Sequence, residues 1–172
     1  MRFAVYGAFE LPRQNGLIDH SQEAMNLFWL QVEDKAKGLS TACGCYVFAA
    51  QNRAWYIGLA EKQAFKYECI TDHKLKIYNK ILASYQRAMP WLYFVAKLTP
   101  KQKFSSPSKN GHQDIAALEK ILIGLGISRN NEIENIRGTK YLREMNVPGI
   151  INMEQGQGKA YAVQEIRSLF GI

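Results

Sequence analysis

The amino-acid sequence predicts an α+β domain built around a small antiparallel sheet. Two β-rich runs, 44–50 and 54–58, are separated by only three residues, which indicates a β-hairpin. Apolar residues recur at helical spacing on both sides of this hairpin, which indicates flanking helices. Apolar residues make up 47% of the 172 residues and charged residues 22%, as in ordinary globular proteins. We therefore expect 1–172 to form a single domain.

Capping and breaking residues divide the chain into elements. Gly38 follows one helical pattern, Thr71 and Asp72 are suited to cap another, and Pro90 stops it. The run after Pro90 has no polar side chain except a tyrosine hydroxyl, so it predicts a buried strand. The expected elements in chain order are a strand over 3–9, a helix over 21–37, the hairpin, helices over 61–69 and 73–87, a strand over 91–95, a loop over 99–111, an apolar helix over 112–127, a helix near 138–145, a Pro148-Gly149 turn, a glycine-rich loop at 156–158 and a last helix to about Phe170.

The cysteines and the hydropathy of the chain suggest a compartment. The apolar stretches are far shorter than the ~20 residues that span a bilayer, and the N-terminus lacks the apolar core of a signal peptide. Cys43, Cys45 and Cys69 cannot all pair with one another, and their spacing is unlike that of a zinc finger. We therefore expect buried thiols, no contact with a membrane, and a cytoplasmic protein.

The excess positive charge of the chain lies in one segment. The net charge is +7, yet no Asp or Glu occurs between His73 and Gln113, and the rest of the chain is close to neutral. Eight basic residues lie in this acid-free segment: Lys74, Lys76, Lys80, Arg87, Lys97, Lys101, Lys103 and Lys109. Such segregation favours a polyanionic partner, with nucleic acid first, over a face that serves only solubility.

The hairpin carries tyrosines close to two glycines. If its loop spans 51–53, Phe48 faces Tyr56, and Tyr46 lies on the same face as both. The other face then holds only apolar residues and predicts the core: Cys45, Val47, Ala49, Trp55 and Ile57. Gly44 and Gly58 could let a ligand approach the backbone on the tyrosine face. A two-residue loop would place the tyrosines on opposite faces, and tyrosines are also common in strands for purely structural reasons.

A single acidic residue lies inside the apolar arc of the helix over 112–127. On a helical wheel, Glu119 falls between Ile115 and Ile123. A carboxylate in this place requires a cation, hydrogen-bond donors or a metal, and one carboxylate with water and phosphate is enough to hold Mg²⁺. The alternative is a glutamate at the helix rim paired with a lysine. Asn135 follows Glu119 and could orient phosphate or a metal-bound water, although Asn in a loop is often part of a turn.

In combination, these residues resemble the GIY-YIG nuclease superfamily. The two triplets that name the family appear as Gly44-Cys45-Tyr46 and Tyr56-Ile57-Gly58. Glu119 and Asn135 match the later Glu and Asn of the family in order and spacing. The resemblance covers about 44–135 and leaves 1–43 and 136–172 as additions. It implies a three-stranded antiparallel sheet flanked by helices.

The resemblance also implies an activity, which is hydrolysis of DNA phosphodiester bonds with one divalent metal ion. Glu119 would hold Mg²⁺ or Mn²⁺, and Tyr46 or Tyr56 would take a proton from the attacking water. Lys66, eight residues after Gly58, stands where family members carry a catalytic Arg, and it would stabilise charge on the phosphate. Residues expected to bind nucleic acid, DNA first and RNA second, are Lys62, His73, Lys74, Arg87, Lys101, Lys103 and Lys109.

Two residues differ from the family pattern. Cys45 in the first triplet faces the core, so its effect is small. Lys66 offers only a point charge where Arg would offer a bidentate fork. Three hypotheses therefore follow: a metal-dependent DNA endonuclease, a catalytically impaired scaffold that binds nucleic acid, and a basic protein-interaction domain. The sequence does not indicate an oligomeric state.

Overall fold

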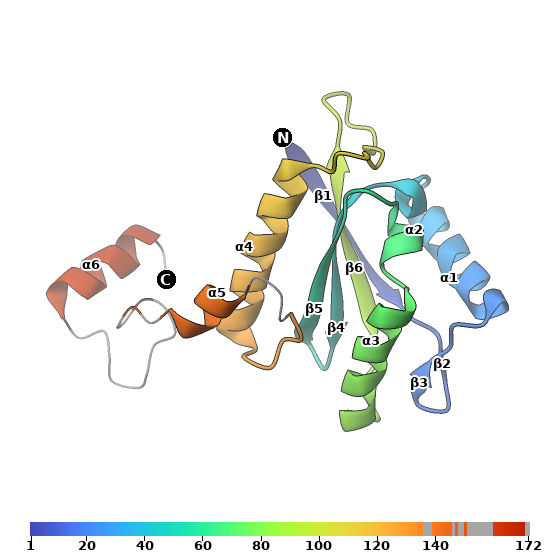
Figure 1. The fold of residues 1–172 in the computed structure, drawn as a ribbon, viewed down its shortest axis with the longest axis horizontal. Helices are drawn as coiled ribbons and strands as arrows, with labels where there is room; N and C mark the ends of the chain where they lie inside the picture. Colours follow the sequence, from blue (N-terminus) through green and yellow to red (C-terminus); the bar gives the residue numbers. More distant parts are fainter. Residues whose placement is uncertain (136–138, 146, 148–149, 151–159, 171–172) are drawn as a thin grey trace.

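The computed structural model describes residues 1–135, 139–145, 147, 150 and 160–170. The described chain forms a four-stranded antiparallel sheet with the strand order β1-β6-β4-β5, and helices cover both of its faces (Figure 1). The elements are β1 (Arg2–Glu10), β2 (Arg13–Gln14), β3 (Leu17–Ile18), α1 (Gln22–Lys35), the 3-10 turn η1 (Leu39–Thr41), β4 (Gly44–Ala50), β5 (Arg53–Ala60), α2 (Phe65–Glu68), α3 (Asp72–Ser84), β6 (Trp91–Leu98), α4 (Gln113–Arg129), α5 (Lys140–Glu144) and α6 (Tyr161–Phe170).

The predicted α+β class is confirmed, whereas the expectation of a three-stranded sheet is wrong. β1 adds a fourth strand by pairing along the whole of β6, from Arg2 opposite Leu98 to Glu10 opposite Trp91. Without β1, the long apolar strand β6 would be an exposed edge, open to pairing with other chains. The N-terminal extension therefore completes the sheet, and β5 forms its other edge.

The two faces of the sheet are both buried. α1, α2 and α3 cover one face through a large cluster that includes Phe28, Phe65 and Tyr78. α4 covers the other face with Ile115, Ile123 and Ile127. Tyr46 and Phe48 belong to the first of these clusters, so the face expected to stay open for a ligand is part of the core. The predicted buried thiols Cys43, Cys45 and Cys69 are confirmed.

The predicted pairing of Phe48 with Tyr56 is present in the hairpin, but the loop is shorter than predicted. The loop is the two residues Gln51 and Asn52, both with positive φ, and Ala50 pairs with Arg53 instead of Ala54. An irregularity in pairing between Phe48 and Ala49 leaves Trp55 as an extra residue on β5.

This extra residue restores the expected pairing of Phe48 with Tyr56, so the tyrosines share a face despite the short loop. Trp55 itself was expected on the face of Cys45, and that expectation is wrong. It packs with Tyr85 and donates its indole N–H to the Ala50 carbonyl. The bulge turns its side chain toward α3.

The helix expected over 61–69 is wrong in extent, because α2 spans only Phe65–Glu68. Glu61 forms two hydrogen bonds with the segment before α4. Its backbone carbonyl accepts the Ser108 N–H, and its side-chain carboxylate accepts the His112 N–H at 3.0 Å. These bonds hold the chain against the start of α4, so the helix begins only at Phe65. α1, α3, β6 and α4 lie close to their predicted positions.

The C-terminal extension contributes two described helices, α5 and α6. The predicted Pro148-Gly149 turn and the glycine-rich loop at 156–158 lie outside the described residues. Within the part of the chain that the structure describes, every helix is too short or too polar to cross a membrane.

Candidate functional site

Tyr46, from the first triplet, lies on β4. Its side chain is fully buried in the hydrophobic cluster between the sheet and α1, α2 and α3. Its ring lies over Gly58, where an added Cβ would overlap the phenol. The glycine of the second triplet therefore makes room for the tyrosine of the first rather than for a ligand. Gly44 likewise lets the backbone of Val95 on β6 pass close by.

The Tyr46 hydroxyl has no hydrogen-bond partner among the described residues. Burial raises the pKa of this phenol well above its ordinary value, and Tyr78 and Tyr56 nearby add to the effect. A buried polar atom without a partner is unusual in a folded protein and calls for an explanation. Tyr46 is therefore held neutral, pointing toward the edge strand β5 and out of contact with solvent.

Tyr56, from the second triplet, is half-buried at the edge strand and meets a cation from α3. The Lys74 ammonium lies 5.2 Å from the centre of the Tyr56 ring and 3.8 Å from a Glu68 carboxylate oxygen. Burial raises the pKa of Glu68, and Lys74 partly offsets that rise. Tyr46 and Tyr56 have their ring centres 6.3 Å apart. The two tyrosines, Lys74 and Glu68 thus form one cluster.

Glu119 is half-buried on α4, on the other side of β5 from α3 (Figure 1). Burial raises the pKa of its carboxyl to about 6, Lys74 opposes that rise, and Glu61 adds to it. Within the described chain, Glu119 accepts no hydrogen bond and forms no ion pair, although Lys74 is close enough to act on its charge. The negative charge of this carboxylate is therefore only partly offset by cations of the protein.

Lys66 does not join this cluster. It lies on α2 with its ammonium 4.8 Å from the centre of the Tyr67 ring, and it acts electrostatically on Glu33 near the end of α1. Lys62 and His73 are exposed, in the segment before α2 and in the first turn of α3. The cation beside the tyrosines is Lys74, which the sequence suggested only as a contact for nucleic acid.

Asn135 is buried and bound to the edge strand. Its amide oxygen accepts the Ile57 N–H at 2.9 Å, and its amide nitrogen donates to the Ile57 carbonyl at 2.6 Å. Both ends of the amide are thus engaged in supporting β5, the sheet edge that no further strand covers. In this arrangement the side chain is not directed at a phosphate or a metal ion.

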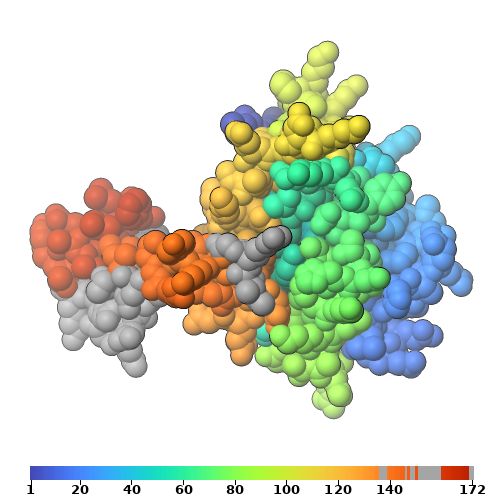
Figure 2. Space-filling model, in the orientation of Figure 1, coloured from blue at the N-terminus to red at the C-terminus, as the bar shows by residue number. Residues whose placement is uncertain are grey.

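The basic residues of the acid-free segment separate into four groups, one of which is Lys76 alone, exposed on α3. Three lysines of the segment are paired with carboxylates: Lys74 with Glu68, Lys80 with Glu134, and Lys97 with Asp114. Lys101, Lys103 and Lys109 are exposed on the loop after β6, which projects at the top of the molecule (Figure 2). Arg87 follows the far end of α3, at the opposite end of the sheet.

The described residues hold no group of three or more His, Cys, Asp or Glu side chains arranged to bind a metal ion. A metal that needs only one carboxylate, as Mg²⁺ does when water and phosphate supply the rest, is compatible with Glu119. Sequence reasoning missed Glu68, which joins the cluster only through the fold, and Glu61, which acts on the charge of Glu119, because neither lies in a motif. Comparisons with family models, curated proteins and solved structures gave no match.

Proposed function

We propose that this protein is a metal-dependent endonuclease that hydrolyses DNA phosphodiester bonds, with a GIY-YIG-like site at the β5 edge. The observation that carries the proposal is the half-buried carboxylate of Glu119: burial raises its pKa to about 6, and its charge is only partly offset by Lys74, the lysine that contacts Tyr56. A carboxylate left in this state disfavours folding, and such groups concentrate at functional sites. The cluster brings together a phenol, a cation and an acid, which phosphodiester hydrolysis can use.

Each group has a distinct role in the proposed reaction. Tyr56 is the general base that takes a proton from the attacking water, because it is the one of the two triplet tyrosines that water can reach. Lys74 offsets the negative charge that develops on the phosphate, in the role expected of Lys66. Tyr46 supports the Tyr56 ring from within the core.

Glu119 is the residue suited to hold the metal ion. Its oxygens are not committed to hydrogen bonds with described residues, and a divalent cation would favour its ionised form. When bound, Mg²⁺ or Mn²⁺ would draw charge from the scissile phosphate and the leaving oxygen.

Nicking of supercoiled plasmid in Mg²⁺ or Mn²⁺ tests this proposal. We expect Glu119→Gln, Tyr56→Phe and Lys74→Ala each to slow nicking by roughly a hundredfold or more, since each removes a group from the reacting centre. Lys76→Ala is the matched control: it removes an exposed lysine from the same helix and leaves the rate unchanged. The proposal fails if the wild type nicks no faster than Glu119→Gln with either metal.

A second candidate is a nucleic-acid-binding module that does not cut. It is favoured by the engagement of Asn135 with Ile57 and by the distance of Lys66 from the tyrosines. DNA affinity that is strong, salt-dependent and unchanged by Glu119→Gln, together with no nicking, would select this candidate.

A further inference from the structure

Helix α4 carries apolar residues on two sides. The sheet covers one of them, and α5 lies against part of the remaining surface through Leu142, near Gly124. The sheet side of α4 buries Ile115, Ile123 and Ile127. On the opposite side, Ile121 is 60% and Leu125 61% exposed. These two and the half-buried Leu118 and Leu122 form a continuous row at helical spacing, here named the α4 stripe. An apolar face of a helix is normally buried against another element.

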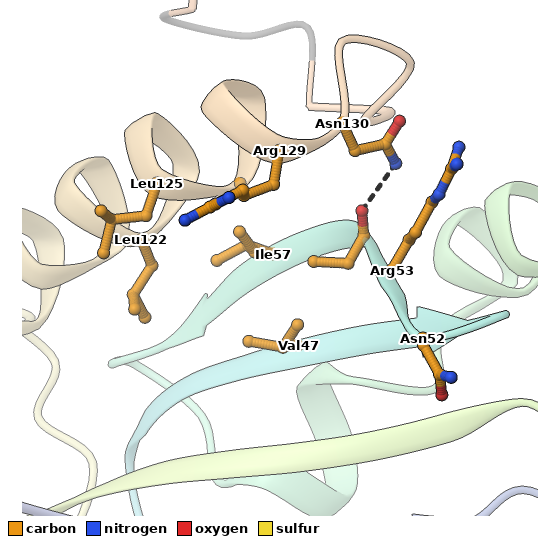
Figure 3. A pocket seen from close by; sticks show the side chains of 10 residues that line it. Val47, Asn52, Arg53, Ile57, Leu122, Leu125, Arg129 and Asn130 are labelled. Carbon is orange, nitrogen blue, oxygen red and sulfur yellow. Dashed lines mark hydrogen bonds between the residues drawn. The ribbon is translucent and has the colours of Figure 1, made fainter. Parts of the chain in front are cut away.

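The α4 stripe leads into a groove with a basic rim. The groove has a volume of about 440 Å³, and its apolar surface includes Val47 and Ile57 beneath Leu122 and Leu125 (Figure 3). Arg129 lies along one wall beside Leu125, and Arg53 rises on the other side, near Asn130 (Figure 3). Neither arginine forms an ion pair with a described acidic residue. The groove is therefore suited to an apolar helix that carries an acid.

Helix α6 has the complementary surface. Leu169 is 83% and Phe170 71% exposed, and with Ala162 and Ile166 they form one apolar row along the helix. Glu165 lies next to Leu169 on the helical wheel, at the border of this row. α6 stands apart from α4 in the single chain (Figures 1 and 2).

We propose that α6 of a second copy of this chain docks on the α4 stripe and its groove, so that two copies form a reciprocal dimer. Apolar anchors on a helix seated in a groove are a common mode of recognition. Within one chain both surfaces stay uncovered, whereas a two-fold pair covers all four with a single type of contact. Glu165 then meets the arginine rim, which sets the orientation of the helix.

A disulfide placed across the proposed contact identifies the partner. The native cysteines are buried, so the full chain with Leu125→Cys and Leu169→Cys offers two accessible thiols. Under mild oxidation we expect a covalent dimer on non-reducing gels. A crosslinked monomer would mean that α6 docks on its own α4, and no crosslink would mean that it docks on neither; either result overturns the proposal.

Solution mass measured over a range of concentrations gives an independent test. We expect a concentration-dependent dimer whose affinity falls at least tenfold with Leu125→Lys or with Leu169→Lys, about 1.4 kcal/mol or more. Leu30→Lys on α1 is the control, because it changes an equally exposed leucine outside the contact. Arg129→Glu should weaken the dimer, and adding Glu165→Arg should restore it. A wild type that stays monomeric at the highest concentration measured contradicts the proposal.

Discussion

At the scale of single residues, Tyr46 and Tyr78 differ in the hydrogen bonding of their hydroxyl groups. Both phenols are fully buried, but only Tyr78 has a partner, the Cys69 carbonyl at 2.9 Å, while the Tyr46 hydroxyl has none among the described residues. An unsatisfied buried hydroxyl lowers the free energy of unfolding, and a satisfied one raises it. A phenylalanine at position 46 would fill the same space without burying an unpaired hydroxyl.

We predict that Tyr46→Phe raises the free energy of unfolding by about 1 kcal/mol, because it removes only the unpaired hydroxyl. Tyr78→Phe should lower that free energy by about the same amount, since it leaves the Cys69 carbonyl without its donor. Urea denaturation of the three proteins measures both changes. Equal destabilisation by the two variants would show that the Tyr46 hydroxyl has a partner in solution.

Glu119 leads to a prediction about pH. Burial raises the pKa of this carboxyl to about 6 from an ordinary value of 4.5, so the folded state holds the proton more tightly than the unfolded chain does. Ionisation of Glu119 therefore opposes folding as the pH rises through this interval.

Glu119→Gln, which cannot ionise, should be more stable than the wild type by about 1 kcal/mol above pH 6, a value reduced for the partial exposure of the side chain. Near pH 4 the two proteins should be equally stable, because the wild-type carboxyl is then protonated. Denaturation at both pH values measures the difference. A gap of the same size at both would attribute it to packing rather than to charge.

At the scale of elements, the edge strand β5 depends on residues far from it in the sequence. Asn135 bonds both backbone groups of Ile57, and the Asn130 amide donates to the Ala54 carbonyl. The segment after α4 thus takes the place of a neighbouring strand. Sequence spacing identified Asn135 as a candidate residue, but the identity of its partner depends on how α4 packs against β5.

We predict that Asn135→Ala lowers the free energy of unfolding by about 2–4 kcal/mol, because two buried backbone groups lose their partner. Asn131→Ala, an exposed position in the same segment, should change it by less than about 0.5 kcal/mol. Urea denaturation compares the two. If Asn135→Ala is as stable as the wild type but inactive, the residue serves the reaction rather than the strand.

At the scale of the whole molecule, the acid-free segment provides less free charge than its sequence suggests. Three of its lysines are paired, Lys76 is exposed on α3, and the other four basic residues lie at two ends of the molecule. The loop that carries Lys101, Lys103 and Lys109 holds the largest group of exposed basic residues in this segment.

If the protein binds DNA as proposed, replacing these three loop lysines with alanine should make the salt dependence of binding less steep. The expected change is about 2–3 in the slope of log affinity against log salt, with one counterion released for each lost phosphate contact. Arg87→Ala, at the other end of the molecule, should leave the slope unchanged. Fluorescence anisotropy at several salt concentrations measures it. Equal effects of the two changes would argue against a localised interface.

Local patterns in the sequence determined the α+β class, most of the helices and strands, and the position of Glu119 within an apolar arc. These features depend on residue periodicity and turn chemistry, which act over a few residues. The tertiary structure decided that β1 completes the sheet, that Tyr46 is buried, that Asn135 supports β5, and that Lys74 rather than Lys66 meets the tyrosines. Each of these depends on contacts between segments that are distant in the sequence, such as the bonds of Glu61 to the segment before α4, which local patterns do not encode.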